Sequence, residues 1–336
     1  MKEFFKFDLQ LFANPNTNVT TDDGKQPSGI KNDLSPTMKT FYKTSLLENA
    51  RNEHYYNQFG QKQPLPKNNG NKVEWRKFDT YAPALTPLTE GVTPDGNKTS
   101  IRKIEQSINQ YGDYTTVSDR LELEAVDPII MGVTEEHGAQ AGDTLEIVTR
   151  NELLTCTNYF RPGAKAENAL TKTDVITSTL VNQAVTFLKK THTPTINGDY
   201  IAIIHPSCSF DLRESAGWLD CHKYAQPEEI YNGEIGKLHG VRFIESTLAP
   251  VEKKGASGVA VYHTFVFGMN AYGIIDPSAE SLEVIVKQRG SAGTADPLDQ
   301  RSTVGWKASH AAKILYPERI VDIETGSAFS DVDEAN

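Results

Sequence analysis

The sequence lacks any apolar run long enough to span a membrane, and only three of its 336 residues are cysteines. A transmembrane helix needs about 20 consecutive apolar residues, so we expect no membrane association. Cys156, Cys208 and Cys221 lie far apart and form no CxxC pair. This spacing argues against a disulfide framework and against a zinc site built on paired cysteines.

Positive charge is also sparse. The formal net charge is −10, from 34 lysines and arginines against 44 aspartates and glutamates, and the longest basic runs are the pairs at 189–190 and 253–254. A protein that holds nucleic acid through its phosphates carries a basic stripe. The composition therefore argues against a protein that binds nucleic acid through its phosphates.

Recognisable catalytic motifs are missing as well. Gly233, Gly236 and Gly240 could suggest a phosphate-binding loop, but Lys237 is followed by Leu238 and then by a predicted strand, whereas a Walker loop needs Gly-Lys-Ser/Thr entering a helix. The eight histidines show no metal-ligand spacing, and there is no Gly-x-Ser-x-Gly elbow. Paired catalytic carboxylates stay open, because an acidic chain supplies many. The sequence thus predicts no catalytic, cofactor-binding or metal site.

Residues 1–12 form an apolar segment that does not fit a signal peptide, because Lys6 and Asp8 interrupt its apolar core. Four apolar residues alternate with polar ones along it: Phe5, Phe7, Leu9 and Leu11. Such an arm can add to an exposed sheet edge, and a disordered tail is the open alternative. A linker-like segment, 13–37, follows, and the spacing of apolar residues then predicts a helix over 38–59.

A long hairpin is predicted between residues 73 and 108. Segments 73–78 and 101–108 have extended character, and Pro83, Pro87 and Pro94 lie between them, which prevents a helix or a central strand there. A projecting hairpin of this length needs a neighbour to cover it. An ordinary irregular surface loop is the alternative, although loops this long are uncommon in compact domains.

The remainder contains both helices and strands, and we expect an α+β fold, in which a helix–strand–helix succession suggests an α/β subdomain. Apolar residues at helical spacing predict a helix over 127–159, roughly 45 Å long, and a second over 173–190 with a capping box at Thr171 and Asp174. A third helix is expected near Ser207. Strands are predicted at 200–204, 241–246, 259–267, 282–287 and 320–324.

The stretch 297–315 (PLDQRSTVGWKASHAAKIL) is the most informative of the chain, and it predicts a turn followed by a long amphipathic strand. Trp306, Ala308, His310, Ala312 and Ile314 fall on one face of that strand, and more polar residues fall on the other. Alternation with a period of two is typical of a half-buried strand.

Two motifs and a weaker third resemble the major capsid proteins of tailed phages, in particular the N-four-type family. They are residues 233–246 (GEIGKLHGVRFIES), 296–315 (DPLDQRSTVGW and the strand that continues it) and 7–13 (FDLQLFA). The resemblance implies the Hong Kong-type capsid fold, with an N-terminal arm, an extended β-hairpin loop, a long spine helix, a peripheral domain and an axial domain. The implied ranges are 1–60 for the arm, 72–116 for the extended loop, 117–169 with 256–325 for the peripheral domain with its spine helix, and 170–255 for the axial domain.

The resemblance also implies a function. The chain would assemble with copies of itself into hexamers and pentamers that form the icosahedral head around double-stranded DNA, with an acidic lining that keeps DNA from adhering. It would form in the host bacterial cytoplasm, end in the virion, and have scaffolding, portal and decoration proteins as possible partners. The implied contact residues between subunits are Phe5, Phe7, Leu9 and Leu11 in the arm and Trp75, Tyr81, Leu85 and Leu88 in the loop. A phage tail or other structural assembly protein is the main alternative, and a soluble α/β enzyme is the other.

Overall fold

The computed structural model describes residues 54–66, 70–125, 129–215, 218, 234–277, 282–291 and 296–336. The predicted N-terminal arm and most of the helix expected at 38–59 lie outside these residues. The end of that helix is present as α1 (Tyr56–Phe59), a single turn. Among the described residues, no helix is both long and apolar enough to cross a membrane.

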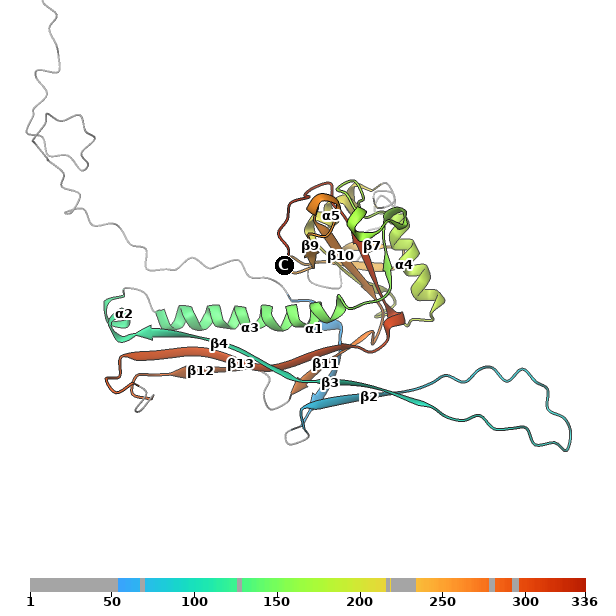
Figure 1. Cartoon of the computed structure of the whole chain (residues 1–336), viewed down its shortest axis with the longest axis horizontal. Helices are drawn as coiled ribbons and strands as arrows, with labels where there is room; N and C mark the ends of the chain where they lie inside the picture. Colours follow the sequence, from blue (N-terminus) through green and yellow to red (C-terminus); the bar gives the residue numbers. More distant parts are fainter. Residues whose placement is uncertain are drawn as a thin grey trace, which may run out of the picture. The chain divides into compact units, whose positions relative to one another are not determined.

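A seven-stranded sheet forms the larger core (Figure 1). Its strand order is β5-β14-β10-β6-β8-β7, and β9 pairs with β10 at the side of this path. The strands are β5 (Tyr159–Phe160), β6 (Tyr200–Ile204), β7 (Glu234–Leu238), β8 (Val241–Glu245), β9 (Val251–Glu252), β10 (Val261–Phe267) and β14 (Ile320–Thr325). Among the described strands of this sheet, the parallel pairs are β5 with β14 and β6 with β8.

Both faces of this sheet are covered, which explains why β6 and β10 are buried at every residue. Tyr200, Ala202 and Ile204 share one apolar core with the helices α4 (Ser178–Lys190) and α5 (Pro206–Glu214). Ile201 and Ile203 point to the other face, where they join a second core with α1 and the end of α3 (Ile129–Leu153). Central strands buried on both faces read as continuous apolar runs rather than alternating ones.

The second sheet has five strands in the order β1-β11-β13-β12, with β4 also paired to β13. Its members are β1 (Gln61–Leu65), β4 (Asn109–Ser118), β11 (Tyr272–Pro277), β12 (Leu282–Lys287) and β13 (Arg301–Ile314). The predicted alternation in β13 is confirmed on the first face, where Trp306 and Ala308 are buried against Ala141 of α3. The prediction of a half-buried strand is wrong for the opposite face, because Ser309 and Ala311 are buried there and Ala311 joins a small core with Val73.

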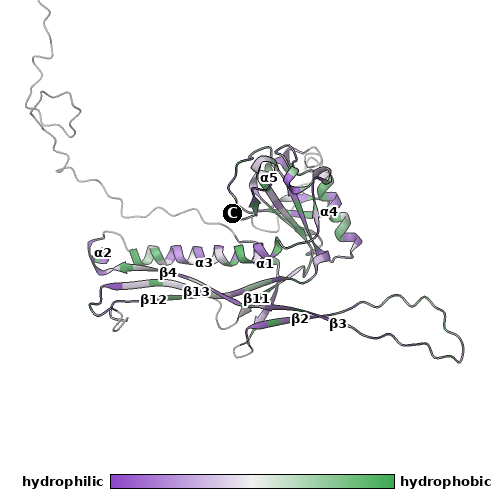
Figure 2. Ribbon diagram, viewed as in Figure 1, coloured by the Kyte–Doolittle hydropathy of each residue, from purple (hydrophilic) through white to green (hydrophobic). Residues whose placement is uncertain are grey.

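The helix α3 runs alongside β4 and β13 (Figure 1), and polar side chains add hydrogen bonds to the apolar contact at Ala141. Hydrophilic and hydrophobic turns alternate along it (Figure 2). His137 Nε2 lies 3.0 Å from Thr115 Oγ1, and Trp306 Nε1 donates to Gln140 Oε1 at 3.0 Å. The helix is shorter than predicted, because it ends at Leu153 and not near Tyr159. The chain turns there, and Tyr159 pairs with Asp322 of β14 instead.

The second predicted helix also begins later than expected. Thr177 caps it, and α4 starts at Ser178 rather than near 173. Asp174 does not cap this helix. Its Oδ2 accepts hydrogen bonds from the backbone N–H and the hydroxyl of Thr171, both at 2.8 Å, and its Oδ1 lies 2.6 Å from Lys165 Nζ. This closes a tight turn that leaves Ile176 buried in the core.

The hairpin of β2 (Lys72–Phe78) and β3 (Ile101–Ser107) is present as predicted and forms its own two-stranded sheet. In the larger sheet, strands that are far apart along the chain pair with each other. The range implied for the peripheral domain, 256–325, contains β10 and β14, and both pair within the sheet of β6 and β8.

Candidate assembly surfaces

The base of the hairpin is anchored on the five-stranded sheet by Trp75. A Cβ placed at Gly273 of β11 would lie 2.9 Å from Trp75 Cζ2, so the indole rests on the glycine backbone. Val73 is buried beside it with Ile275 and Ala311. The sequence analysis expected Trp75 to contact another subunit, but its side chain is partly buried against its own chain.

Lys77 supplies a second anchor. Its ammonium lies 2.8 Å from Glu318 Oε1 and 4.2 Å from the ring centre of Tyr316. Burial raises the pKa of Glu318, but the nearby Lys77 outweighs it and leaves that pKa below its ordinary value. These contacts tie the hairpin to the segment that leads into β14, so the direction in which it leaves the sheet is defined.

Beyond the anchors, the hairpin extends into a loop, residues 79–100, that is visible at its far end in Figure 1. Asp79 N–H donates to Ser100 O at 3.2 Å, and the hydroxyls of Tyr81 and Thr99 are in contact. Every residue from 80 to 100 is exposed, and Leu85 and Leu88 retain 86% and 78% of their accessible surface. Large exposed apolar side chains gathered on one segment mark an interaction surface.

The sequence analysis missed one apolar pair on the same hairpin. Phe78 and Ile101 lie directly opposite each other where the strands end, and they are 65% and 55% exposed. The sequence could have indicated this pair, because Phe78 is the last residue of one predicted strand and Ile101 is the first residue of the other. We define the hairpin surface as Phe78, Tyr81, Leu85, Leu88, Val92 and Ile101.

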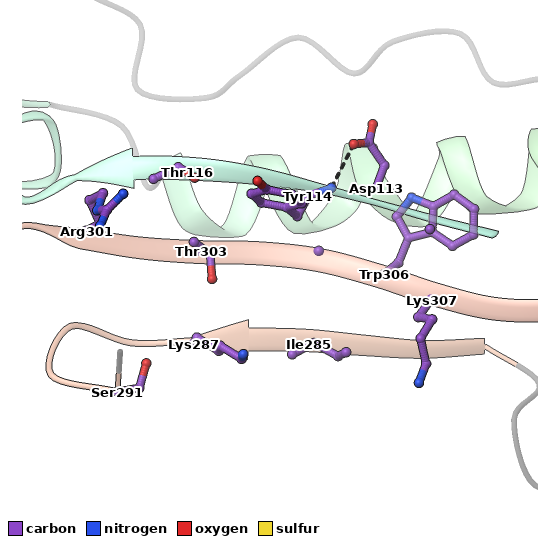
Figure 3. Close-up of a pocket in the computed structure, with 12 residues that line it drawn as sticks. Asp113, Tyr114, Thr116, Ile285, Lys287, Ser291, Arg301, Thr303, Trp306 and Lys307 are labelled. Carbon is purple, nitrogen blue, oxygen red and sulfur yellow. Dashed lines mark hydrogen bonds between the residues drawn. The ribbon is translucent and has the colours of Figure 1, made fainter. Parts of the chain in front are cut away.

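A hollow of about 700 Å³ lies on the face of β4, β13 and β12, lined by side chains from all three strands (Figure 3). Gly305 of β13 stands directly opposite Tyr114 of β4 and Ile285 of β12. Lys287 and Lys307 bring positive charge to its lining. The hollow is therefore a second candidate surface for a polar or acidic partner segment.

Potential metal ligands meet beside β9, β10 and β14 of the seven-stranded sheet. Among the described residues, ligand atoms of Glu167, Glu252 and His263 lie within 4.8 Å of one another, and so do those of His263, Asp322 and Glu324. Burial lowers the pKa of His263, but the charge and hydrogen bond of Asp322, together with Glu252 and Glu324, outweigh it and raise that pKa to about 10. The sequence predicted no metal site here, because these residues are far apart along the chain.

No family model and no curated protein matches the sequence. The structure resembles solved phage capsids over nearly the whole chain. The capsid of cyanophage P-SCSP1u is 12% identical, covers 93% of this chain and 100% of its own, and has a TM-score of 0.68. The capsid of cyanophage Pam1 is 11% identical over 88% and 98%, with a TM-score of 0.67. The capsid of Ralstonia phage GP4 is 12% identical over 90% and 98%, with a TM-score of 0.66.

The chain has the Hong Kong-type capsid fold. The order of elements predicted from the sequence agrees with it: a hairpin loop, then the long helix α3, then the seven-stranded sheet and the late strand β13. The roles of the expected contact residues stay predictions. Tyr81, Leu85 and Leu88 lie on the exposed loop, Trp75 lies at its base, and the four arm residues, Phe5, Phe7, Leu9 and Leu11, lie outside the described residues.

Proposed function

We propose that this chain is the major capsid protein of a tailed phage and builds the icosahedral head. The observation that carries the proposal is the near-complete mutual coverage with the phage capsid structures, since no large part of either chain is left over for another activity. The exposed loop at 79–100 is the complementary observation, because an apolar extension needs burial on another chain.

The hairpin surface is proposed to lie on a neighbouring copy. Each such contact buries few side chains, but every subunit makes several, and their combined strength holds the shell together. Identical patches repeated under symmetry generate closed hexamers and pentamers. The arm residues, from Phe5 to Leu11, would add a further contact on another copy.

The proposed domains follow the Hong Kong-type division. The arm is 1–60, the extended loop 72–116, the axial domain 170–255, and the peripheral domain 117–169 with 256–325. Because β10 pairs with β6, and β14 pairs with β10, we propose that these two strands belong with the axial sheet. The remaining part of the peripheral domain then includes α3 and the strands β11, β12 and β13 of the five-stranded sheet.

The role is proposed to be structural rather than enzymatic, in the virion, with assembly in the host bacterial cytoplasm. DNA would be enclosed without sequence-specific binding, in keeping with the net charge of −10. Scaffolding, portal and decoration proteins are the further partners expected of a phage head. A tail protein is the second candidate, and small fixed oligomers instead of shells would favour it.

The test is deletion of residues 82–97, which removes the exposed loop and leaves β2 and β3 in place. The chain is expressed with and without co-expressed assembly factors and viewed by negative-stain microscopy. We expect shells from the intact chain and unassembled, folded subunits from the deletion. Shells at normal yield from the deletion would contradict the role of the loop, whereas a compact monomer from the intact chain under all conditions would contradict the capsid function.

A further inference from the structure

Three segments that are separated along the chain meet beside β9 and β10 of the seven-stranded sheet. His263 lies on β10, Glu252 on β9, and Glu167 on the one-turn 3-10 helix η4 (Glu167–Ala169) in the connection from β5 to α4. Their nitrogen and oxygen atoms lie within 4.8 Å of one another. This spacing suits ligands of a single ion.

The orientation of His263 is set from its far side. His263 Nδ1 lies 2.7 Å from Asp322 Oδ2, and because a carboxylate only accepts, the proton of this hydrogen bond belongs to Nδ1. His263 is 4% exposed, and its Nε2 makes no hydrogen bond within the described part of the chain, although it lies 3.3 Å from Glu252 Oε2. A histidine that donates one ring N–H to a carboxylate and directs the other nitrogen into a site is typical of metal centres.

The ammonium group of Lys254 lies at the exposed side of the site. Lys254 Nζ lies 2.6 Å from Glu252 Oε2 and 3.6 Å from Glu167 Oε1, so the ammonium bridges the two carboxylates. The Lys254 side chain is 56% exposed and flexible, and it can move into solvent. Glu167 and Glu252 are each a little under one-third exposed, which leaves an entry path for an ion.

The local charge also favours a divalent ion. Four carboxylates meet here, from Glu167, Glu252, Asp322 and Glu324, against two cations from Arg161 and Lys254. This set carries an excess of two negative charges when the His263 imidazole is neutral, as it is when Nε2 binds a metal. A bound divalent cation neutralises that excess.

We propose that His263 Nε2, Glu252 and Glu167 bind one Zn²⁺ ion, with Asp322 positioning the imidazole. One imidazole nitrogen with two carboxylates is a borderline ligand set that suits zinc, and water completes the coordination. The ion would join η4 to β9 and β10, so its effect is to fix the β5–α4 connection to this sheet in each subunit. The site is independent of the hairpin surface and of the proposed capsid function.

The test uses the full chain after treatment with a chelator, followed by equilibrium dialysis against Zn²⁺ and elemental analysis. We expect one zinc per chain and a higher unfolding temperature with Zn²⁺, because a ligand that binds only the folded state stabilises it. The double variant Glu167→Gln and Glu252→Gln should bind zinc at least about 10-fold more weakly and lose the thermal shift. Glu245→Gln is the matched control, since Glu245 is 31% exposed on the same sheet and pairs with Arg213.

X-ray absorption at the zinc edge identifies the ligands. Nitrogen and oxygen ligands alone support the site, whereas sulfur ligands would assign the zinc to a cysteine and overturn it. The proposal also fails if the intact chain binds no zinc, as expected if a second proton permanently occupies His263 Nε2. Equal binding by the intact chain and the double variant would exclude these ligands. The double variant's circular dichroism establishes that it is folded.

Discussion

The indole of Trp75 lies directly on the backbone of Gly273, at the point where the β2–β3 hairpin leaves the five-stranded sheet. A Cβ at Gly273 would be 2.9 Å from Trp75 Cζ2 and 3.1 Å from Leu315 Cδ1. The hairpin is therefore held in place by a contact that only glycine permits. The surface proposed for assembly depends on this anchor for its position.

Gly273→Ala should displace the indole and lower the free energy of unfolding. We expect a loss of about 1–3 kcal/mol, the usual effect of an added methyl group in a tightly packed site. Urea unfolding followed by tryptophan fluorescence measures it. Gly96→Ala is the control, because nothing lies within 4 Å of a Cβ there. Equal stability of the two variants would show that Trp75 is not fixed by Gly273.

Leu85→Ser with Leu88→Ser should abolish shell assembly without destabilising the subunit. Both side chains are exposed in the subunit, so their replacement changes its unfolding free energy by less than about 0.5 kcal/mol. Thr86→Ser with Thr89→Ser, on the same loop, should assemble normally. Sedimentation and electron microscopy give the yield of particles. Normal shells from the leucine variant would rule out burial of these leucines between subunits.

Glu146→Ala should be one of the most destabilising single changes in the chain. Glu146 is fully buried on α3, and its carboxylate accepts hydrogen bonds from the backbone N–H groups of Tyr55, Tyr56 and Asn57. Removal leaves three donors without this acceptor, so we expect a loss of about 3 kcal/mol or more in guanidinium unfolding. Glu136→Ala, at an exposed position of the same helix, should change stability little. Similar values for both would mean that water replaces the carboxylate.

Asp174→Asn should have a pH-dependent effect. Burial raises the pKa of Asp174, but Lys165 and the two Thr171 hydrogen bonds outweigh it and leave that pKa below 3.8. A lowered folded-state pKa stabilises the protein above pH 3.8 and stops doing so as the pH falls through the folded value. The deficit of the variant, about 1 kcal/mol at pH 7, should therefore shrink below pH 3.8. Asp95→Asn, on the exposed loop, controls for the loss of one negative charge, and a deficit independent of pH would refute this account.

Local patterns were enough to predict several elements. The strands β6 and β12 have the predicted bounds, and the alternation around Trp306 correctly predicted a long strand. These signals depend only on neighbouring side chains, which must face a core or solvent with the period of their own secondary structure.

Where partners from elsewhere in the chain decide the structure, the sequence prediction was incomplete. The strand β4 was not predicted, because its mostly exposed polar residues show no alternation, and its pairing with β13 alone makes it a strand. Helical spacing extended α3 to Tyr159, but pairing of Tyr159 with β14 ends the helical run earlier.

The sequence by itself determined the elements whose burial pattern is local, the order in which they occur, and the apolar loop that needs a partner. Tertiary structure alone decided which strands share a sheet, how Trp75 anchors the hairpin, and that Glu167, Glu252 and His263 meet. The reason is physical: the spacing of residues along a strand or helix sets which face a side chain occupies, whereas long-range pairing depends on the packing of the whole chain.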